Sequence, residues 1–68
     1  MTNYSFSVVL TDTYDFSEVY TIYDCDNKEV GLVSRCDDIF QACRDENSCP
    51  EADFYNMFDC VKYLFSIR

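Results

Sequence analysis

The first half of the chain alternates between apolar and polar residues in a way that is typical of β-strands. The segment Tyr4–Leu10 places an apolar side chain at every second position, which predicts a strand with one buried face. Glu18–Asp24 is rich in β-branched and aromatic residues and predicts a second strand, and Glu29–Ser34 predicts a third, shorter one. The turn-forming residues Asp26 and Asn27 predict a hairpin between the second and third strands.

The pattern changes to a helical period after the third strand. Apolar side chains at i, i+3, i+4 and i+7 define one helical face, formed by Cys36, Ile39, Phe40 and Cys43. Ser34 can cap such a helix, and Asp37 and Asp38 would lie in its first turn, where the helix dipole favours anions. The sequence therefore predicts a helix near residues 35–46.

A second helix is predicted after Ser48. Ser48 and Glu51 have the spacing of a capping box, and Pro50 is compatible with a first helical turn. One apolar stripe follows, made by Phe54, Met57, Phe58, Val61, Leu64 and Phe65. Alternation of apolar residues within 60–68 allows a fourth strand instead, but the stripe runs for three turns without a polar interruption and favours the helix.

These elements predict an α+β fold formed by residues 1–68 as a single domain. The predicted architecture is a three-stranded antiparallel sheet packed on one face by two helices, with a fourth C-terminal strand as the alternative to the end of the last helix. A chain of 68 residues buries only about 60% of the surface that its unfolded form exposes, so its core is thin.

Charge is the most unusual property of the chain. The chain has thirteen acidic residues, five basic residues and no histidine, which gives a net charge of −8. Affinity for a phosphate backbone comes from lysine and arginine, so this balance argues against direct binding to nucleic acid or to an anionic membrane. Solubility alone would explain such a charge, but it is not a compelling explanation, because −8 lies at the top of the range of about 2–8 that a small domain needs.

The five cysteines do not have the spacing of a metal site. Structural zinc sites use pairs of Cys or His ligands two to four residues apart, and no such pair occurs here. We expect no metal, and we expect reduced cysteines that behave as small buried apolar residues. A disulfide of Cys43 with Cys49 or Cys60 is the alternative, and Cys25 is the thiol expected to be exposed.

The composition also argues against an enzyme. Without histidine, no Ser-His or Cys-His pair can form, and a single glycine excludes the usual phosphate-binding loops. We therefore expect no catalytic residues and no cofactor. The N-terminal residues lack a basic leader, and no apolar run reaches the roughly 18 residues of a membrane span, so a cytoplasmic protein is expected.

The carboxylates fall into groups that could bind a positively charged protein. On a helix, side chains three or four positions apart lie about 5–6 Å apart, a spacing that suits successive arginines or lysines. Two tyrosines expected to be exposed, Tyr14 and Tyr55, could anchor the contact, because tyrosine is enriched among the residues that dominate binding energy. The predicted partner-binding acids are Asp12, Asp15 and Glu18 near the first loop, Asp24, Asp26 and Glu29 around the hairpin, and Asp37, Asp38, Asp45 and Glu46 on the first helix.

In its size and in acid-rich stretches such as CDDIFQACRDE and SCPEAD, the chain resembles small phage-encoded anti-defence proteins. These include anti-CRISPR proteins and DNA-mimicking inhibitors of restriction or repair enzymes. The resemblance implies a monomeric, stoichiometric inhibitor in the host cytoplasm. Such an inhibitor would occupy the basic nucleic-acid-binding surface of a Cas effector or another nuclease and exclude target DNA. The alternatives are a small module that self-associates through its aromatic residues, and a secreted disulfide protein.

Overall fold

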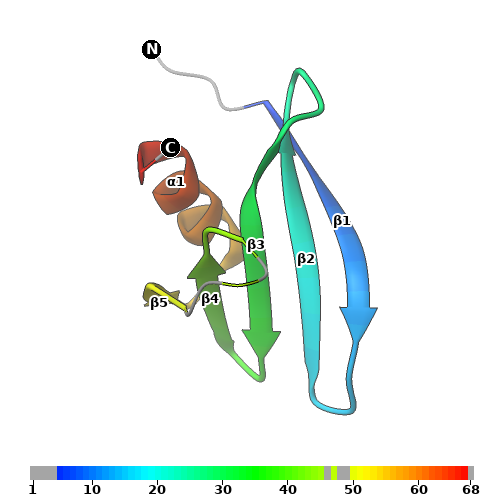
Figure 1. Ribbon diagram of the computed structural model, residues 1–68. Helices are drawn as coiled ribbons and strands as arrows, with labels where there is room; N and C mark the ends of the chain where they lie inside the picture. The colour runs from blue at the N-terminus through cyan, green and yellow to red at the C-terminus, as the bar shows by residue number, and fades with distance from the viewer. Residues whose placement is uncertain (1–4, 46, 48–49, 68) are drawn as a thin grey trace.

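The computed structural model describes residues 5–45, 47 and 50–67, which form five strands and one helix (Figure 1). In chain order the elements are β1 (Phe6–Thr13), β2 (Ser17–Asp24), β3 (Glu29–Cys36), β4 (Ile39–Cys43), β5 (Ala52–Phe54) and α1 (Met57–Ile67).

The five strands form one antiparallel sheet in which the spatial order follows the chain, β1-β2-β3-β4-β5. The predictions of strands over 18–24 and 29–34 are confirmed by β2 and β3, and the hairpin between them is confirmed by their register. Asn27 adopts a left-handed φ of 62° in the connecting turn, a conformation that asparagine tolerates better than most residues.

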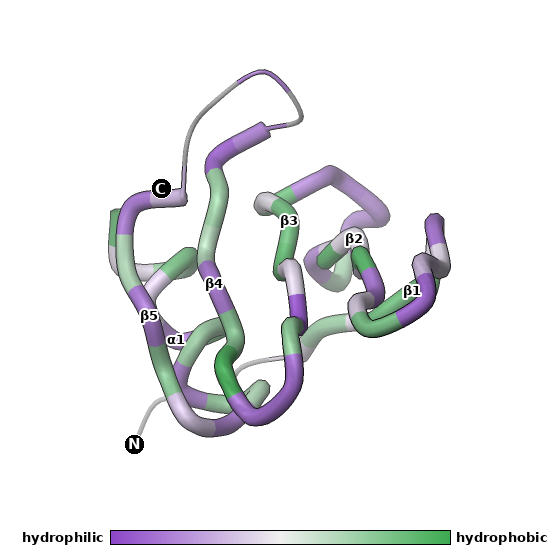
Figure 2. Tube along the Cα trace, turned by 90° about the horizontal axis from the view of Figure 1, so that it is seen from below, coloured by the Kyte–Doolittle hydropathy of each residue, from purple (hydrophilic) through white to green (hydrophobic). Residues whose placement is uncertain are grey.

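The predicted architecture of three strands and two helices is wrong. The described part of the chain contains a single helix, and α1 packs on one face of the sheet against β3, β4 and β5. A helix is about 10 Å wide and strands are about 4.8 Å apart, so one helix covers only two or three strands. Consequently most of β1 extends beyond α1, as the end-on view shows (Figure 2). Only the start of β1 reaches the helix, where the rings of Phe6 and Phe65 have centroids 6.4 Å apart, and β2 contributes Ile22 to the core.

The predicted helix over residues 35–46 is replaced by the β3–β4 hairpin. Cys36 pairs with Ile39, and Asp37 and Asp38 form the tight turn between them. Asp37 has a φ of 56°, which aspartate accepts because its short polar side chain tolerates the left-handed region. The residues that fit a helical spacing also fit a short strand, and pairing with β3 decides between the two.

The second predicted helix begins later than expected. Residues 52–54 form β5, and Glu51 donates its backbone N–H to the carbonyl oxygen of Ala42 instead of entering a helix. The helix is capped at Asn56. Its Oδ1 accepts the Asp59 backbone N–H at 2.8 Å, while its Nδ2 donates to the Asp59 carboxylate at 2.9 Å. Ser48, the predicted cap, lies outside the described residues.

The helical prediction for the C-terminal segment is confirmed for residues 57–67, and the fourth-strand alternative is excluded there. Val61 and Leu64 of the predicted apolar stripe are buried, while Phe54 belongs to β5. Phe58 departs from the prediction because it is exposed, with the Lys62 ammonium 5.5 Å from its ring centroid.

The core lies between α1 and the central strands. Its fully buried side chains are Ile22, Val33, Ala42, Cys60, Val61 and Leu64. Gly31 of β3 lies against Leu64, because a Cβ added at Gly31 would stand 2.8 Å from Leu64 Cδ2 and 2.8 Å from the Cys43 carbonyl oxygen. The absent side chain at Gly31 therefore allows α1 to approach the sheet closely.

The described cysteines are free thiols, and burial divides them into two pairs. Cys43 and Cys60 are buried, as expected, and Cys25 is exposed, as expected. Cys36 is exposed at the end of β3, which corrects its assignment to an apolar helical face. Burial raises the pKa of the Cys60 thiol to about 12, so this group stays neutral at physiological pH. Cys49 lies outside the described residues.

Candidate interaction surface

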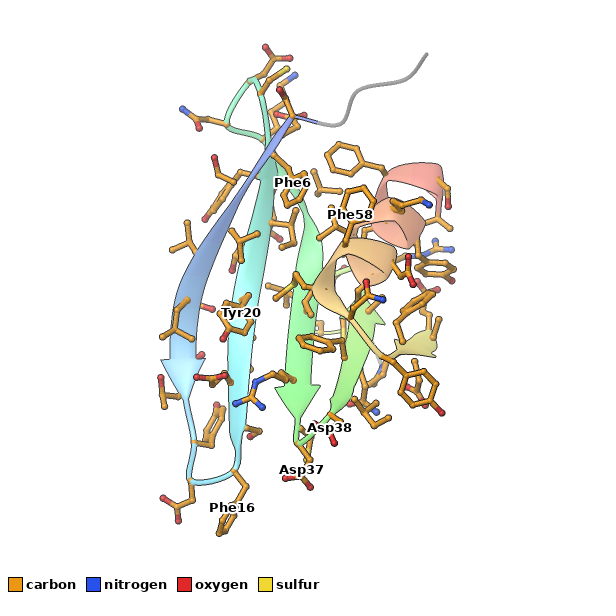
Figure 3. All side chains as sticks on the ribbon, turned by 180° about the vertical axis from the view of Figure 1, so that it is seen from behind. Phe6, Phe16, Tyr20, Asp37, Asp38 and Phe58 are labelled. Carbon is orange, nitrogen blue, oxygen red and sulfur yellow. The ribbon has the colours of Figure 1, made fainter. Side chains whose placement is uncertain are left out.

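Two connecting turns meet at one end of the sheet and bring acidic and aromatic side chains together. Ser17 at the start of β2 pairs with Cys36 at the end of β3, so the β1–β2 turn and the β3–β4 turn project from the same end (Figure 3). Tyr14, Asp15 and Phe16 lie in the first turn, and Asp37 and Asp38 lie in the second. We call this set of five residues the acidic turn face.

The two aromatic residues of the acidic turn face are largely uncovered. The Tyr14 N–H donates to the Ser17 carbonyl oxygen at 2.7 Å and closes the turn, which places Asp15 and Phe16 at its tip. Phe16 is 79% exposed and Tyr14 is 59% exposed. The exposure of Tyr14 agrees with its predicted position in a loop. Phe16 was not among the predicted site residues. Its position in the connection between two predicted strands could have indicated that its ring would be exposed.

A three-residue network next to the acidic turn face engages the nearby arginine. Arg35 Nε lies 2.7 Å and Nη2 2.6 Å from Glu18 Oε1, and the Tyr20 hydroxyl donates to the same oxygen at 2.8 Å. The Tyr20 hydrogen bond and the Arg35 guanidinium lower the pKa of Glu18, and the Glu18 carboxylate raises the pKa of Tyr20. Glu18 is therefore a charge-neutralising partner of Arg35 within the sheet.

Arg35 also fixes the turn that carries two of the acids. Its Nη1 donates to the Asp37 carbonyl oxygen at 2.8 Å, which ties the β3–β4 turn to the side of the sheet. Across the described residues, neither an ion pair nor a hydrogen bond engages the carboxylates of Asp15, Asp37 and Asp38, and all three residues are exposed. The acidic turn face therefore presents three negative charges that no described neighbour neutralises.

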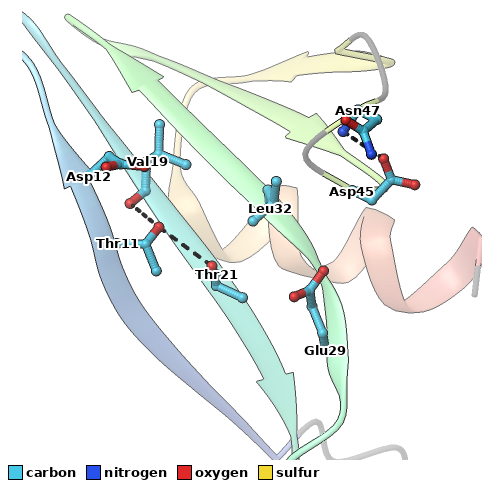
Figure 4. Close-up of a pocket in the computed structure, with 8 residues that line it drawn as sticks. All are labelled: Thr11, Asp12, Val19, Thr21, Glu29, Leu32, Asp45 and Asn47. Atoms are coloured by element: carbon cyan, nitrogen blue, oxygen red, sulfur yellow. Dashed lines mark hydrogen bonds between the residues drawn. The ribbon is translucent and has the colours of Figure 1, made fainter.

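A second group of acids surrounds a hollow on the sheet face opposite α1 (Figure 4). The hollow has a volume of about 500 Å³ and is open to solvent. Val19 and Leu32 contribute apolar side chains to it, and Asp12, Glu29 and Asp45 contribute carboxylates. Asp45 Oδ1 accepts a hydrogen bond from the Asn47 backbone N–H at 2.8 Å, so this carboxylate also stabilises its own loop.

The remaining predicted residues are spread over the molecule. Asp24 is buried, and its Oδ1 accepts the backbone N–H groups of Asp26 and Lys28 at 2.8 and 2.9 Å, so this carboxylate organises the β2–β3 turn. Asp26 is exposed in that turn, at the end of the sheet opposite the acidic turn face. Tyr55 is exposed between β5 and α1. Glu46 lies outside the described residues.

Comparisons with protein-family models, with curated proteins and with solved structures find no match to this chain. Within residues 5–45, 47 and 50–67, no three His, Cys, Asp or Glu side chains gather closely enough to hold a metal ion. In the same residues, no helix has both the length and the apolar character needed to cross a membrane.

Proposed function

We propose that this chain is a stoichiometric protein inhibitor that binds a basic nucleic-acid-binding surface through its acidic turn face. The partner would be a Cas effector complex or another nuclease, and the bound inhibitor would keep target DNA from that surface. The observation that carries the proposal is the gathering of three unpaired carboxylates and two exposed aromatic rings on two adjacent turns.

The spacing of the two turns supports a single electrostatic patch. The turns are separated by about two strand spacings, roughly 10 Å, which is comparable to the Debye length at physiological salt. Their carboxylates therefore add to one negative potential, and such a potential accelerates encounter with a cationic groove and sets the orientation of docking.

Among the described residues, the basic side chains leave this potential largely uncancelled, and Lys28 lies in the β2–β3 turn at the opposite end of the sheet. Arg35 is paired with Glu18, and Arg44 Nε is paired with Glu51 Oε2 at 2.9 Å. Lys62 stands over the Phe58 ring on α1, which packs against β3, β4 and β5. The three carboxylates of the acidic turn face therefore keep most of their negative potential, within a chain whose net charge is −8.

The aromatic residues of the acidic turn face would supply the binding energy that charge attraction alone does not provide. Exposed carboxylates contribute mainly to association rate and selectivity, whereas buried aromatic anchors contribute most of the binding energy at protein interfaces. Tyr14 and Phe16 flank Asp15 and would become buried when the acidic turn face docks. The size and charge of the chain also resemble those of the small phage inhibitors that act in this way.

A charge-altering variant with a matched control tests the proposal. The first variant combines Asp15→Lys, Asp37→Asn and Asp38→Lys; asparagine is used at position 37 because it tolerates the left-handed φ. The control combines Asp26→Lys, Glu29→Lys and Asp53→Asn, which changes the net charge equally at exposed positions elsewhere.

The assay measures displacement of labelled target DNA from an effector captured on the immobilised wild-type protein and identified by mass spectrometry. We expect the first variant to lose about 30-fold or more in inhibitory potency and the control to lose less than about threefold. Equal losses in both variants would place the binding surface elsewhere, and an effector that keeps its DNA in the presence of wild type would end the proposal.

A further inference from the structure

β1 is an edge strand whose outer side meets no other described strand. It is eight residues long and pairs only with β2, at one end of the strand order. In an antiparallel pair, successive residues direct their backbone N–H and C=O groups alternately toward the neighbour and away from it. The outer side of β1 therefore presents a row of backbone donors and acceptors that can pair with another strand.

The centre of β1 is apolar on both sides of the sheet. Val8 and Leu10 pair with Ile22 and Tyr20 on the side that carries α1, but α1 packs mainly on β3, β4 and β5 and covers them only in part. Phe6, at the start of the strand, is the β1 residue whose ring meets Phe65 of α1. Val9 points to the opposite side. Val8 is 39% exposed, Val9 is 44% exposed and Leu10 is 50% exposed. An added strand would cover these side chains on both faces.

The two edges of the sheet differ in the features that normally prevent strand addition. β5, the other edge, has three residues and carries the charged Asp53, and both features discourage pairing. β1 contains neither proline nor lysine, and its charged residue Asp12 and its register shift between Leu10 and Asp12 both lie beyond the apolar centre. The apolar half of β1 is therefore a regular and unprotected edge.

We infer that β1 is a docking edge for an extended strand of a partner protein whose centre is apolar and whose two ends are basic. This inference goes beyond the proposed inhibitory function and does not depend on it. It adds a backbone-paired contact that would fix the register of a partner, which charge attraction alone cannot do.

The charges at the two ends of β1 select this occupant over a second copy of the same chain. One end leads to Asp12 and Asp15, and the other lies beside the β2–β3 turn, where Asp26 and Glu29 outnumber Lys28. Antiparallel pairing of two β1 strands would set the acidic end of one copy against the acidic turn of the other. Like charges placed opposite each other disfavour that pairing, whereas lysines or arginines at both ends of a partner strand match it.

Titration of the isotope-labelled full chain with three blocked eight-residue peptides tests the inference. The first peptide has four central β-branched residues and two basic residues at each end, the second replaces the basic residues with glutamates, and the third places prolines in the centre. We expect only the first to shift the backbone amide resonances of residues 6–13 and to slow their hydrogen exchange. The inference fails if that peptide causes no shift at ~1 mM, or if the proline peptide binds equally well.

Variants of β1 locate the contact. Val9→Lys should lower the affinity for the first peptide at least tenfold. Val9→Thr keeps the β-branched shape and is expected to fold, and it should lower that affinity about threefold. Ser66→Lys on α1 makes the same charge change as Val9→Lys at an exposed site and should leave the affinity unchanged. Unchanged affinity in both Val9 variants, or a wild-type dimer in sedimentation whose contact maps to β1, would overturn the inference.

Discussion

Arg35 of β3 and Glu18 of β2 are paired on adjacent strands and form an ion pair. Arg35 Nη2 lies 2.6 Å and Nε 2.7 Å from the same carboxylate oxygen of Glu18. This pair engages the basic side chain closest in sequence to the β3–β4 turn. The carboxylates of Asp15, Asp37 and Asp38 consequently form no ion pair with the described residues, while the Arg35 guanidinium holds the turn through the Asp37 carbonyl oxygen.

Removal of the Glu18 charge should destabilise the fold in a pH-dependent way. Hydrogen bonds from Tyr20 and Arg35 lower the folded-state pKa of Glu18, so its stabilisation is present above the unfolded value of about 4.3 and is lost as the pH falls through the lower folded value. Urea unfolding of wild type and Glu18→Gln should therefore differ at pH 7 and converge toward about pH 2. Asp15→Asn is the control, and an equal pH-dependent gap in that variant would contradict the account.

Packing of α1 on the sheet should depend on Gly31. In Gly31→Ala the new methyl group would collide with Leu64 and with the Cys43 carbonyl, so we expect a loss of about 1–3 kcal/mol in the free energy of unfolding. Leu64→Ala alone should cost about 2–5 kcal/mol, and the double variant should cost less than the sum because one of the two collisions is relieved. Strict additivity in denaturant unfolding would show that Leu64 does not rest on Gly31.

Thiol reactivity should follow the burial of the cysteines. Cys25 and Cys36 should react rapidly with an alkylating reagent in the native protein, whereas Cys43 and Cys60 should react only after unfolding. Since the folded-state pKa of Cys60 is about 12, its stabilisation is complete below the unfolded thiol pKa of about 8.5 and declines as the pH rises above it. Peptide-resolved mass spectrometry measures the labelling, and fast native modification of Cys60 would refute the buried position.

The helix cap at Asn56 should contribute measurably to stability. Asn56→Ala removes the acceptor of the Asp59 N–H and should lower the free energy of unfolding by about 1 kcal/mol. Asn56→Ser retains an acceptor and should lose much less. Thermal unfolding of the two variants makes the comparison, and equal losses would mean that the side chain does not cap α1.

Local patterns predicted the central hairpin and the C-terminal helix but failed for the segment between them. The run of β-branched and aromatic residues in β2 favours a strand, and α1 has an apolar stripe of three turns that favours a helix. In residues 39–43 the apolar positions fit both periods, because five residues are too few to separate a strand from a helix. Residues 39–43 form a strand because they pair with β3, and local sequence patterns do not report such pairing between strands.

The candidate surface was only partly predictable for the same reason. The acidity and exposure of Asp15, Asp37 and Asp38 follow from the sequence, but their proximity arises from strand order. With residues 35–46 taken as a helix, Asp37 and Asp38 were grouped with Asp45, which instead lies beyond the opposite end of β4. Alternation in β1 predicted a buried face, yet a single helix is too narrow to cover a five-stranded sheet.

The salt dependence of binding is the sharpest test of electrostatic docking through the acidic turn face. The affinity of the wild-type chain for its captured effector would be measured by calorimetry at ~50 and ~200 mM monovalent salt, beside the variant that combines Asp15→Lys, Asp37→Asn and Asp38→Lys. Screening of a cationic partner's attraction to the acidic turn face predicts a loss of about tenfold or more for wild type and a nearly flat response for the variant. An affinity that stays constant in wild type across this range would show that charge attraction does not drive the docking.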